Sequence, residues 1–107
     1  MADRQQGICL KFYLPENRRH HGLLLYEWLL EQARKLGLRG GTVFHGIAGF
    51  GRHHILHETH FFELAGDTPV EVMFVVNDAE EARLMQLLQA EKLGLFYVRM
   101  PVEWGTL

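Results

Sequence analysis

A histidine-rich segment carries the richest chemistry in this chain. His53, His57 and His60 follow i, i+4, i+7 spacing, so a helical turn would place their imidazoles on one side. Imidazole nitrogens bind zinc or copper, and Glu58 or Glu63 can add a carboxylate. Two interpretations stay open beside a metal site: a solvated polar loop that happens to be rich in histidine, and a pH sensor near neutral pH.

A glycine-punctuated segment precedes the histidines. Gly49 and Gly51 flank Phe50 and free the backbone to turn, and Arg52 follows at once. Backbone N–H groups at such a turn can form an anion-binding concavity, and the Arg52 guanidinium suits phosphate or carboxylate. The segment is neither a P-loop nor a Rossmann fingerprint, because no helix start or lysine follows it. The candidate ligand-binding residues are therefore Gly49, Phe50, Gly51 and Arg52. The alternative interpretation is that this segment is only a hinge of the loop.

Composition narrows the class of protein. The chain has 107 residues, 48% of them hydrophobic and 22% charged, which fits one folded domain over residues 1–107. A formal net charge of -2 argues against a nucleic-acid binder, which needs a basic face. Cys9 is the only cysteine, so a reducing, cytoplasmic compartment is expected. No signal segment or apolar run near the ~20 residues of a membrane span occurs, so direct membrane insertion is not expected.

The hydrophobic pattern predicts the element order β-α-β-β-α-β. Strands are predicted at 8–14, 42–48, 70–76 and 95–100, helices at 22–36 and 78–92, and a polar turn at 16–19. Pro101 is expected to end the last strand, and Asp78 to cap the second helix with Glu81 at N3. This order predicts an α+β fold, the ferredoxin-like βαββαβ sandwich, in which a four-stranded antiparallel sheet carries two helices on one face.

The predicted fold leaves one face of the sheet without helices. The side chains expected on it are Cys9, Lys11 and Tyr13; Val43, His45 and Ile47; Glu71, Met73 and Val75; and Tyr97 and Arg99. Such a face is too apolar to stay in water and too charged for a monomer core, so we expect it to pack on another subunit. Lys11, Glu71 and Arg99 would then form paired charges at or near the interface.

The element order, the long loop after the second strand and one motif resemble the PII-like superfamily of small trimeric bacterial signalling proteins. The motif is Gly-x-x-Val-x-x-Gly-Ile-Ala-Gly-Phe-Gly, which occupies residues 40–51 here. It is typical of an uncharacterised PII-like branch of that superfamily. Three further features also fit this branch: the segment from Leu10 to Leu14, His57, and the approach to the third strand from Asp67 to Val70. The resemblance spans nearly the whole chain.

The resemblance implies a regulatory function. It implies a homotrimer that binds a small anionic effector, such as an adenine nucleotide, in the clefts between subunits. Gly49 and Gly51 would form the base of a T-loop over about 49–60, which would act on a membrane transporter or an enzyme as the regulated partner.

The connection after the second helix departs from the PII pattern. Residues 91–95 hold one glycine and one basic residue, fewer than the phosphate loop of PII proteins. In a trimer, a neighbouring subunit could bring Lys11, Arg99 or Lys92 to the same cleft and supply the missing positive charge. Lys11 and Arg99 therefore join the candidate ligand-binding residues.

Two other classes of protein stay open. A trimeric divalent-metal-binding protein of the CutA type would use His53, His57 and His60 as ligands. A small ferredoxin-like monooxygenase acting on heme or quinone would use the same bare sheet face, but typically as a dimer. No serine–histidine–aspartate pattern or pair of catalytic carboxylates stands out, so we do not expect an enzyme. An adenine nucleotide and a divalent metal are both candidate ligands.

Overall fold

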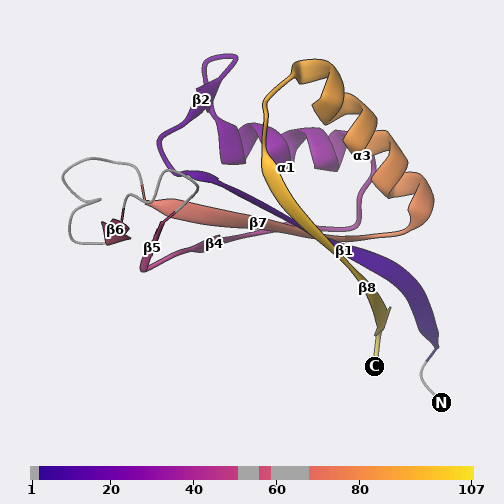
Figure 1. Ribbon diagram of the computed structural model, residues 1–107. Coiled ribbons are helices and arrows are strands. Elements are labelled where there is room, and N and C mark those ends of the chain that lie inside the picture. Colours follow the sequence, from indigo (N-terminus) through magenta and orange to yellow (C-terminus); the bar gives the residue numbers. More distant parts are fainter. Residues whose placement is uncertain (1–2, 51–55, 59–67) are drawn as a thin grey trace.

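A four-stranded antiparallel sheet organises the computed structural model, which describes residues 3–50, 56–58 and 68–107 (Figure 1). Its strands are β1 (Arg4–Pro15), β4 (Thr42–His45), β7 (Pro69–Val76) and β8 (Phe96–Gly105), in the order β4-β7-β1-β8. The helices are α1 (Leu25–Lys35) and α3 (Asp78–Glu91). Two short ribbons complete the described elements: β2 (Arg19–His20) with β3 (Leu23–Leu24), and β5 (Ala48–Phe50) with β6 (Leu56–Glu58).

Both helices cover the same face of the sheet, as Figure 1 shows. The two central strands, β1 and β7, pair antiparallel from Ile8↔Val76 to Pro15↔Pro69. Strand β4 pairs with the outer side of β7, and β8 with the outer side of β1. The predicted ferredoxin-like α+β fold, with four antiparallel strands and two helices on one face, is confirmed. Among the described residues, no helix is both long and apolar enough to span a membrane.

The core lies between the sheet and the helices. Alternate residues of β1 and β7 are fully buried there, and the Phe12 and Phe74 rings meet edge to face at 6.1 Å. Leu29 of α1 and Leu84 of α3 close the core from above. Each such side chain contributes about 1.5–3 kcal/mol by leaving water. The clean alternation in β1 and β7 therefore fixes which face of the sheet the helices cover.

The side-chain alternation expected for the two edge strands was wrong. Val43 lies opposite Val72 and joins the core face, so Thr42 and Phe44 occupy the open face of β4 instead of Val43 and His45. A break at Gly46 separates β4 from β5 and removes Ile47 from that strand.

In β8 the alternation is also reversed. Tyr97 lies opposite Phe12 and Arg99 opposite Leu10, so both lie on the helix face. The open face of β8 carries Phe96, Val98 and Met100, because these pair with the open-face residues of β1. The more apolar set of β8 side chains thus points away from the helices.

Element boundaries also differ from the sequence-based expectation; β1, for example, begins at Arg4 rather than at residue 8. Strand β8 continues through Pro101 because it is an edge strand, where a missing N–H need not break a ladder. Asn77, not Asp78, caps α3: its side chain accepts from the Glu80 N–H, and the Glu80 carboxylate accepts from the Asn77 N–H, both at 2.8 Å. The β2–β3 ribbon follows the expected polar turn, so α1 begins at Leu25 rather than Gly22.

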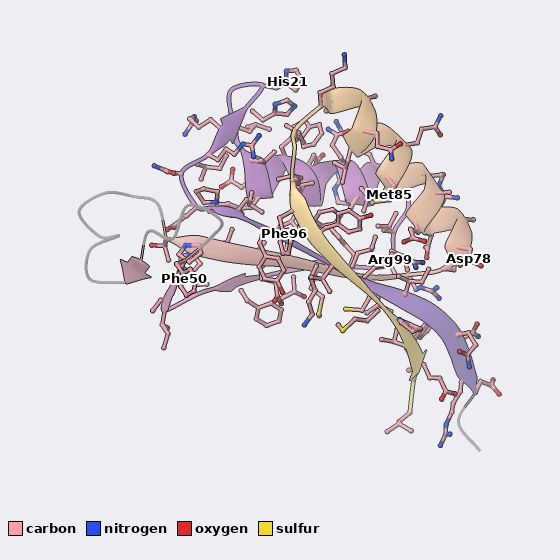
Figure 2. The ribbon with its side chains drawn as sticks, viewed as in Figure 1. His21, Phe50, Asp78, Met85, Phe96 and Arg99 are labelled. Carbon is pink, nitrogen blue, oxygen red and sulfur yellow. The ribbon has the colours of Figure 1, made fainter. Side chains whose placement is uncertain are left out.

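The face of the sheet opposite the helices is called here the open face. Its residues are Cys9, Lys11, Tyr13, Thr42, Phe44, Glu71, Met73, Val75, Phe96, Val98 and Met100. Side chains project from this side of the sheet in Figure 2, with no helix over them. Most of these side chains are apolar, and Phe96 is 68% exposed. An exposed apolar face of this extent is typical of a subunit contact.

Candidate ligand-binding site

The strand register brings three connections to one end of the sheet. Tyr13 pairs with Phe96, Pro15 with Pro69, and His45 with Val70, so β1 and β4 end where β7 and β8 begin. The β5–β6 ribbon, the β2–β3 ribbon and the chain between α3 and β8 all leave from this end (Figure 1). Candidate binding groups from distant parts of the sequence therefore lie at a common edge.

The base of the long loop is a β-ribbon. Gly49 pairs with His57 and Phe50 with Leu56. Gly46 donates its N–H to the Pro69 carbonyl at 2.8 Å, and a Cβ at Gly46 would lie 3.1 Å from Pro69 Cγ. Gly46 thus lies in close contact with both the backbone and the ring of Pro69. This contact anchors the ribbon to the start of β7.

Several predicted site residues lie outside the described part of the chain. These are Gly51, Arg52, His53 and His60, and the side chain of His57 is also outside it. Their assignment to an anion site or a metal site stays a prediction. Gly49 and Phe50 are described, and Phe50 is exposed near the loop base (Figure 2).

A groove of about 300 Å³ runs between the last turns of α3 and the start of β8. Its lining residues are Phe12, Met85, Leu88, Gln89, Lys92, Leu93, Gly94, Leu95 and Tyr97. The Phe12 and Tyr97 rings lie 6.0 Å apart. An apolar, aromatic lining with a few polar groups at its edge is the usual composition of a small-molecule site.

Lys92 and the chain that follows it give the groove a positive, polar edge. Lys92 (φ 53°) and Gly94 (φ 66°) adopt left-handed backbone conformations that turn the chain back toward the sheet. Arg18 donates from Nη2 to the Leu93 carbonyl at 2.6 Å and ties this turn to the β2–β3 ribbon. An ammonium group beside an apolar groove can bind the phosphate of a ligand whose base fills the groove.

Lys11 and Arg99 lie on opposite faces of the sheet, so one chain does not bring them together. Arg99 donates from Nε and Nη2 to the two carboxylate oxygens of Glu81, at 2.8 and 3.0 Å. This paired hydrogen bond with Glu81 raises the pKa of Arg99. Arg99 therefore has a partner on α3, while Lys11 lies on the open face between Met73 and Val98.

Sequence reasoning missed a cluster at the end of α3. His20 Nε2 and His21 Nε2 lie 3.0 and 2.9 Å from the same atom, Glu91 Oε1. The hydrogen bond from His20, and next that from His21, lowers the pKa of Glu91. Adjacent histidines before a glycine were the signal in the sequence, but nothing there places them beside residue 91.

A second hollow, of about 340 Å³, lies at the opposite end of the sheet. Asp3, Arg4, Glu103 and Trp104 line it. The Arg39 guanidinium stacks 3.9 Å from the centre of a Trp104 ring. This hollow lies away from the loop base and the groove.

The chain is a βαββαβ sandwich in which one face of the sheet is apolar and uncovered. A ribbon follows its second main strand, and a groove lies beside its second helix. These features together are the architecture of the PII-like fold. Residues 7–102 match the model of the DUF190 family, described as "Uncharacterized ACR, COG1993". This chain belongs to that family. The resemblance to an uncharacterised family with the PII-like fold is thereby confirmed.

Two relatives share the sequence over most of the chain. The UPF0166 protein of Aquifex aeolicus is 30% identical over 86 residues, which is 80% of this chain and 82% of the relative. The UPF0166 protein MJ1524 of Methanocaldococcus jannaschii is 35% identical over 72 residues, which is 67% of this chain and 64% of the relative.

Solved structures share the fold. CPII from Thiomonas intermedia K12, a nitrogen regulatory PII-like protein bound to ADP, AMP and bicarbonate, superimposes with a TM-score of 0.71 at 18% identity. The match covers 97% of this chain and 92% of CPII. A candidate PII-like signaling protein, TTHA0516 from Thermus thermophilus, gives a TM-score of 0.63 at 17% identity, covering 95% and 91% of the two chains.

Proposed function

We propose that this protein is a PII-like regulatory protein that binds an adenine nucleotide in clefts between the subunits of a homotrimer. The observation that carries the proposal is the fold shared with CPII over 97% of this chain, because CPII was solved with ADP and AMP. The loop over about 49–60 then acts on a partner protein, either a transporter or an enzyme. The protein catalyses no reaction itself in this proposal, and it works in the cytoplasm.

The open face supports an oligomer. In a monomer, alternation in an edge strand favours apolar side chains toward the core. Here β8 directs Phe96, Val98 and Met100 away from the helices, and Tyr97 and Arg99 toward them. This arrangement lowers the free energy only if another surface covers the open face. A second and third copy of the chain provide that surface in the proposed trimer.

The groove beside α3 supports a nucleotide ligand. Tyr97, Phe12 and Met85 offer apolar surface to a base, and Lys92 offers a positive charge to a phosphate. The groove lies at the same end of the sheet as the loop base, so a ligand there can influence the loop. A neighbouring subunit would complete the cleft and bring further groups to the phosphates.

A thermal-shift screen tests the proposed ligand. ADP, AMP and ATP should raise the melting temperature in proportion to the logarithm of their concentration, because a ligand that binds only the native state stabilises it. GDP and CTP are the controls and should raise it less. Equal shifts with all five nucleotides would contradict an adenine site.

Light scattering on the same samples separates the dimeric monooxygenase class from the two trimeric classes. A mass of three chains supports a trimer of the PII-like or the CutA type, and the nucleotide shift then distinguishes these two. A mass of two chains, with no nucleotide shift, would support the ferredoxin-like monooxygenase class instead.

A further inference from the structure

Two imidazoles and one carboxylate converge at the end of α3, outside the groove. His20 and His21 come from the β2–β3 ribbon, and Glu91 is the last residue of α3. His20 Nε2 lies 3.0 Å and His21 Nε2 lies 2.9 Å from Glu91 Oε1. Each of the three residues offers one possible metal-ligand atom, and these three atoms all lie within 4.8 Å of one another. Figure 2 shows His21 at the top of the molecule, at the far end of α3 from Asp78.

The local fold holds these groups in place. His21 (φ 51°) and Gly22 (φ 80°) are the two central residues of the ribbon turn, both in the left-handed region, as a type I′ hairpin requires. Among the described residues, His21 and Lys92 are the two non-glycine residues with positive φ; His21 belongs to the cluster, and Lys92 directly follows Glu91. The His20 ring lies 4.6 Å from Trp28, edge to face, and Arg18 ties the ribbon to Leu93.

The Glu91 carboxylate and the end of α3 favour a cation at this corner, while the neighbouring Lys92 lines the groove and Arg18 binds the Leu93 carbonyl. The first turn of α3 carries three acidic residues, and its last turn carries no basic one. Glu91 thus places a carboxylate at the helix end where the macrodipole is already negative. A cation between Glu91 and the two imidazoles would interact favourably with both the carboxylate and the helix end.

We propose that His20, His21 and Glu91 bind a divalent transition-metal ion, and that Zn²⁺ fits best. Zn²⁺ binds imidazole nitrogen and carboxylate oxygen at about 2.0–2.2 Å, which places tetrahedral ligand atoms about 3.3 Å apart. The observed separations from Glu91 Oε1 need to open by only a few tenths of an ångström. On binding, the metal takes the Nε2 lone pairs, and the protons that bridge these nitrogens to Glu91 move to Nδ1 or to solvent.

The site has room for a fourth ligand. The His21 side chain is 62% exposed, whereas those of His20 and Glu91 are 19% and 29% exposed. Water can therefore reach the metal from the His21 side and complete four-coordination. This proposal uses none of the loop histidines, and it does not depend on nucleotide binding.

Calorimetric titration of ZnCl₂ into the tag-free, full-length protein without nucleotide tests the site. One Zn²⁺ per chain should bind, and Glu91→Gln, which keeps the shape but removes the charge, should weaken binding at least ~10-fold. His21→Asn is the second variant, because asparagine tolerates the left-handed backbone of the turn. It should weaken binding similarly, with an unchanged circular dichroism spectrum. Co²⁺ should give tetrahedral d–d absorption bands in the wild type and lose them in both variants.

The chain offers a matched control. The triple variant His53→Ala/His57→Ala/His60→Ala keeps the cluster and should bind Zn²⁺ as the wild type does. Loss of binding in the triple variant, with retention in Glu91→Gln and His21→Asn, would overturn the proposal in favour of the loop. Absence of Zn²⁺ binding by the wild type would overturn it as well.

Discussion

The Tyr13 hydroxyl donates a hydrogen bond to Glu71 Oε1 at 2.9 Å across the open face of the sheet. The two residues lie directly opposite each other on β1 and β7, where cross-strand side chains interact most strongly. The pair gives the Glu71 carboxylate a partner within an otherwise largely apolar face. This hydrogen bond lowers the cost of placing the Glu71 carboxylate in a subunit contact.

The first prediction concerns the pH dependence of this pair. Burial raises the pKa of the Tyr13 hydroxyl. The hydrogen bond to Glu71, and the negative charge of the Glu71 carboxylate, raise this pKa further. A raised pKa in the folded state means that the neutral phenol stabilises the fold fully below about pH 10, and that this contribution disappears as pH rises through the folded pKa. Urea unfolding at pH 8 and pH 10.5 should show a smaller alkaline loss for Tyr13→Phe than for the wild type. An identical loss in the two proteins would contradict this assignment.

The second prediction concerns the open face as a subunit contact. Met73→Asp places a charge at the centre of that face, which should cost the interface on the order of several kcal/mol. Light scattering should then give the mass of a monomer, while the wild type gives a trimer. Gln86→Asp, at an exposed position of α3, is the control and should stay trimeric. A trimeric Met73→Asp protein would show that another surface holds the subunits.

The third prediction separates two neighbouring glycines. A Cβ at Gly41 would lie 2.5 Å from the Phe74 ring and 3.0 Å from Leu30, whereas a Cβ at Gly40 meets nothing within 4 Å. Gly41→Ala should therefore lower the free energy of unfolding by about 1–3 kcal/mol through overpacking. Gly40→Ala should change it by less than about 0.5 kcal/mol. Chemical denaturation of both variants checks this, and equal effects would contradict the packing at Phe74.

The fourth prediction tests the positive edge of the groove. Lys92→Ala should weaken ADP binding by about 1.5–3 kcal/mol, roughly 10- to 150-fold, if the ammonium binds a phosphate. Rising salt should also weaken ADP binding by the wild type. Lys35→Ala, at an exposed position of α1, is the control. Arg52→Ala should weaken binding by a similar amount if the loop base contributes to the same anion site. Unchanged affinity in Lys92→Ala would remove this lysine from the ligand site.

The central strands were predictable because each has a clean two-residue alternation. The side chains that point to the core include Leu10 and Phe12 in β1, and Val72 and Phe74 in β7. With the core face of these strands known, the element order determines the fold. The edge strands were not predictable in the same way. The break at Gly46 interrupts the alternation after β4, and a one-residue shift moves every side chain to the other face.

In β8 the apolar set faces away from the helices. The sequence pattern alone does not indicate this orientation, because apolar side chains of an edge strand usually face the core. Arg99 donates to Glu81 of α3 on the helix side, a contact between two residues 18 positions apart in the sequence.

The candidate site was predictable only in part. The glycine pattern marked Gly49 as the base of a T-loop; Gly49 lies in β5 and pairs with His57, and its role in such a loop stays a prediction. Lys92 was named as a basic residue of the α3–β8 connection. The cluster of His20, His21 and Glu91 was not predictable, because a two-residue turn and a helix end 70 residues later meet only in the folded chain. The short-range spacing that indicated His53, His57 and His60 cannot detect a contact between residues so far apart in the sequence.

Calorimetric titration of ADP into the wild type and into Met73→Asp tests whether a nucleotide binds between subunits. Saturable binding of one ADP per chain is expected for a trimeric wild type, and loss of both the trimer and most of the affinity is expected for Met73→Asp. Binding of ADP to a monomeric Met73→Asp protein with wild-type affinity would contradict a site between subunits. A wild type that binds no adenine nucleotide would contradict the proposed function itself.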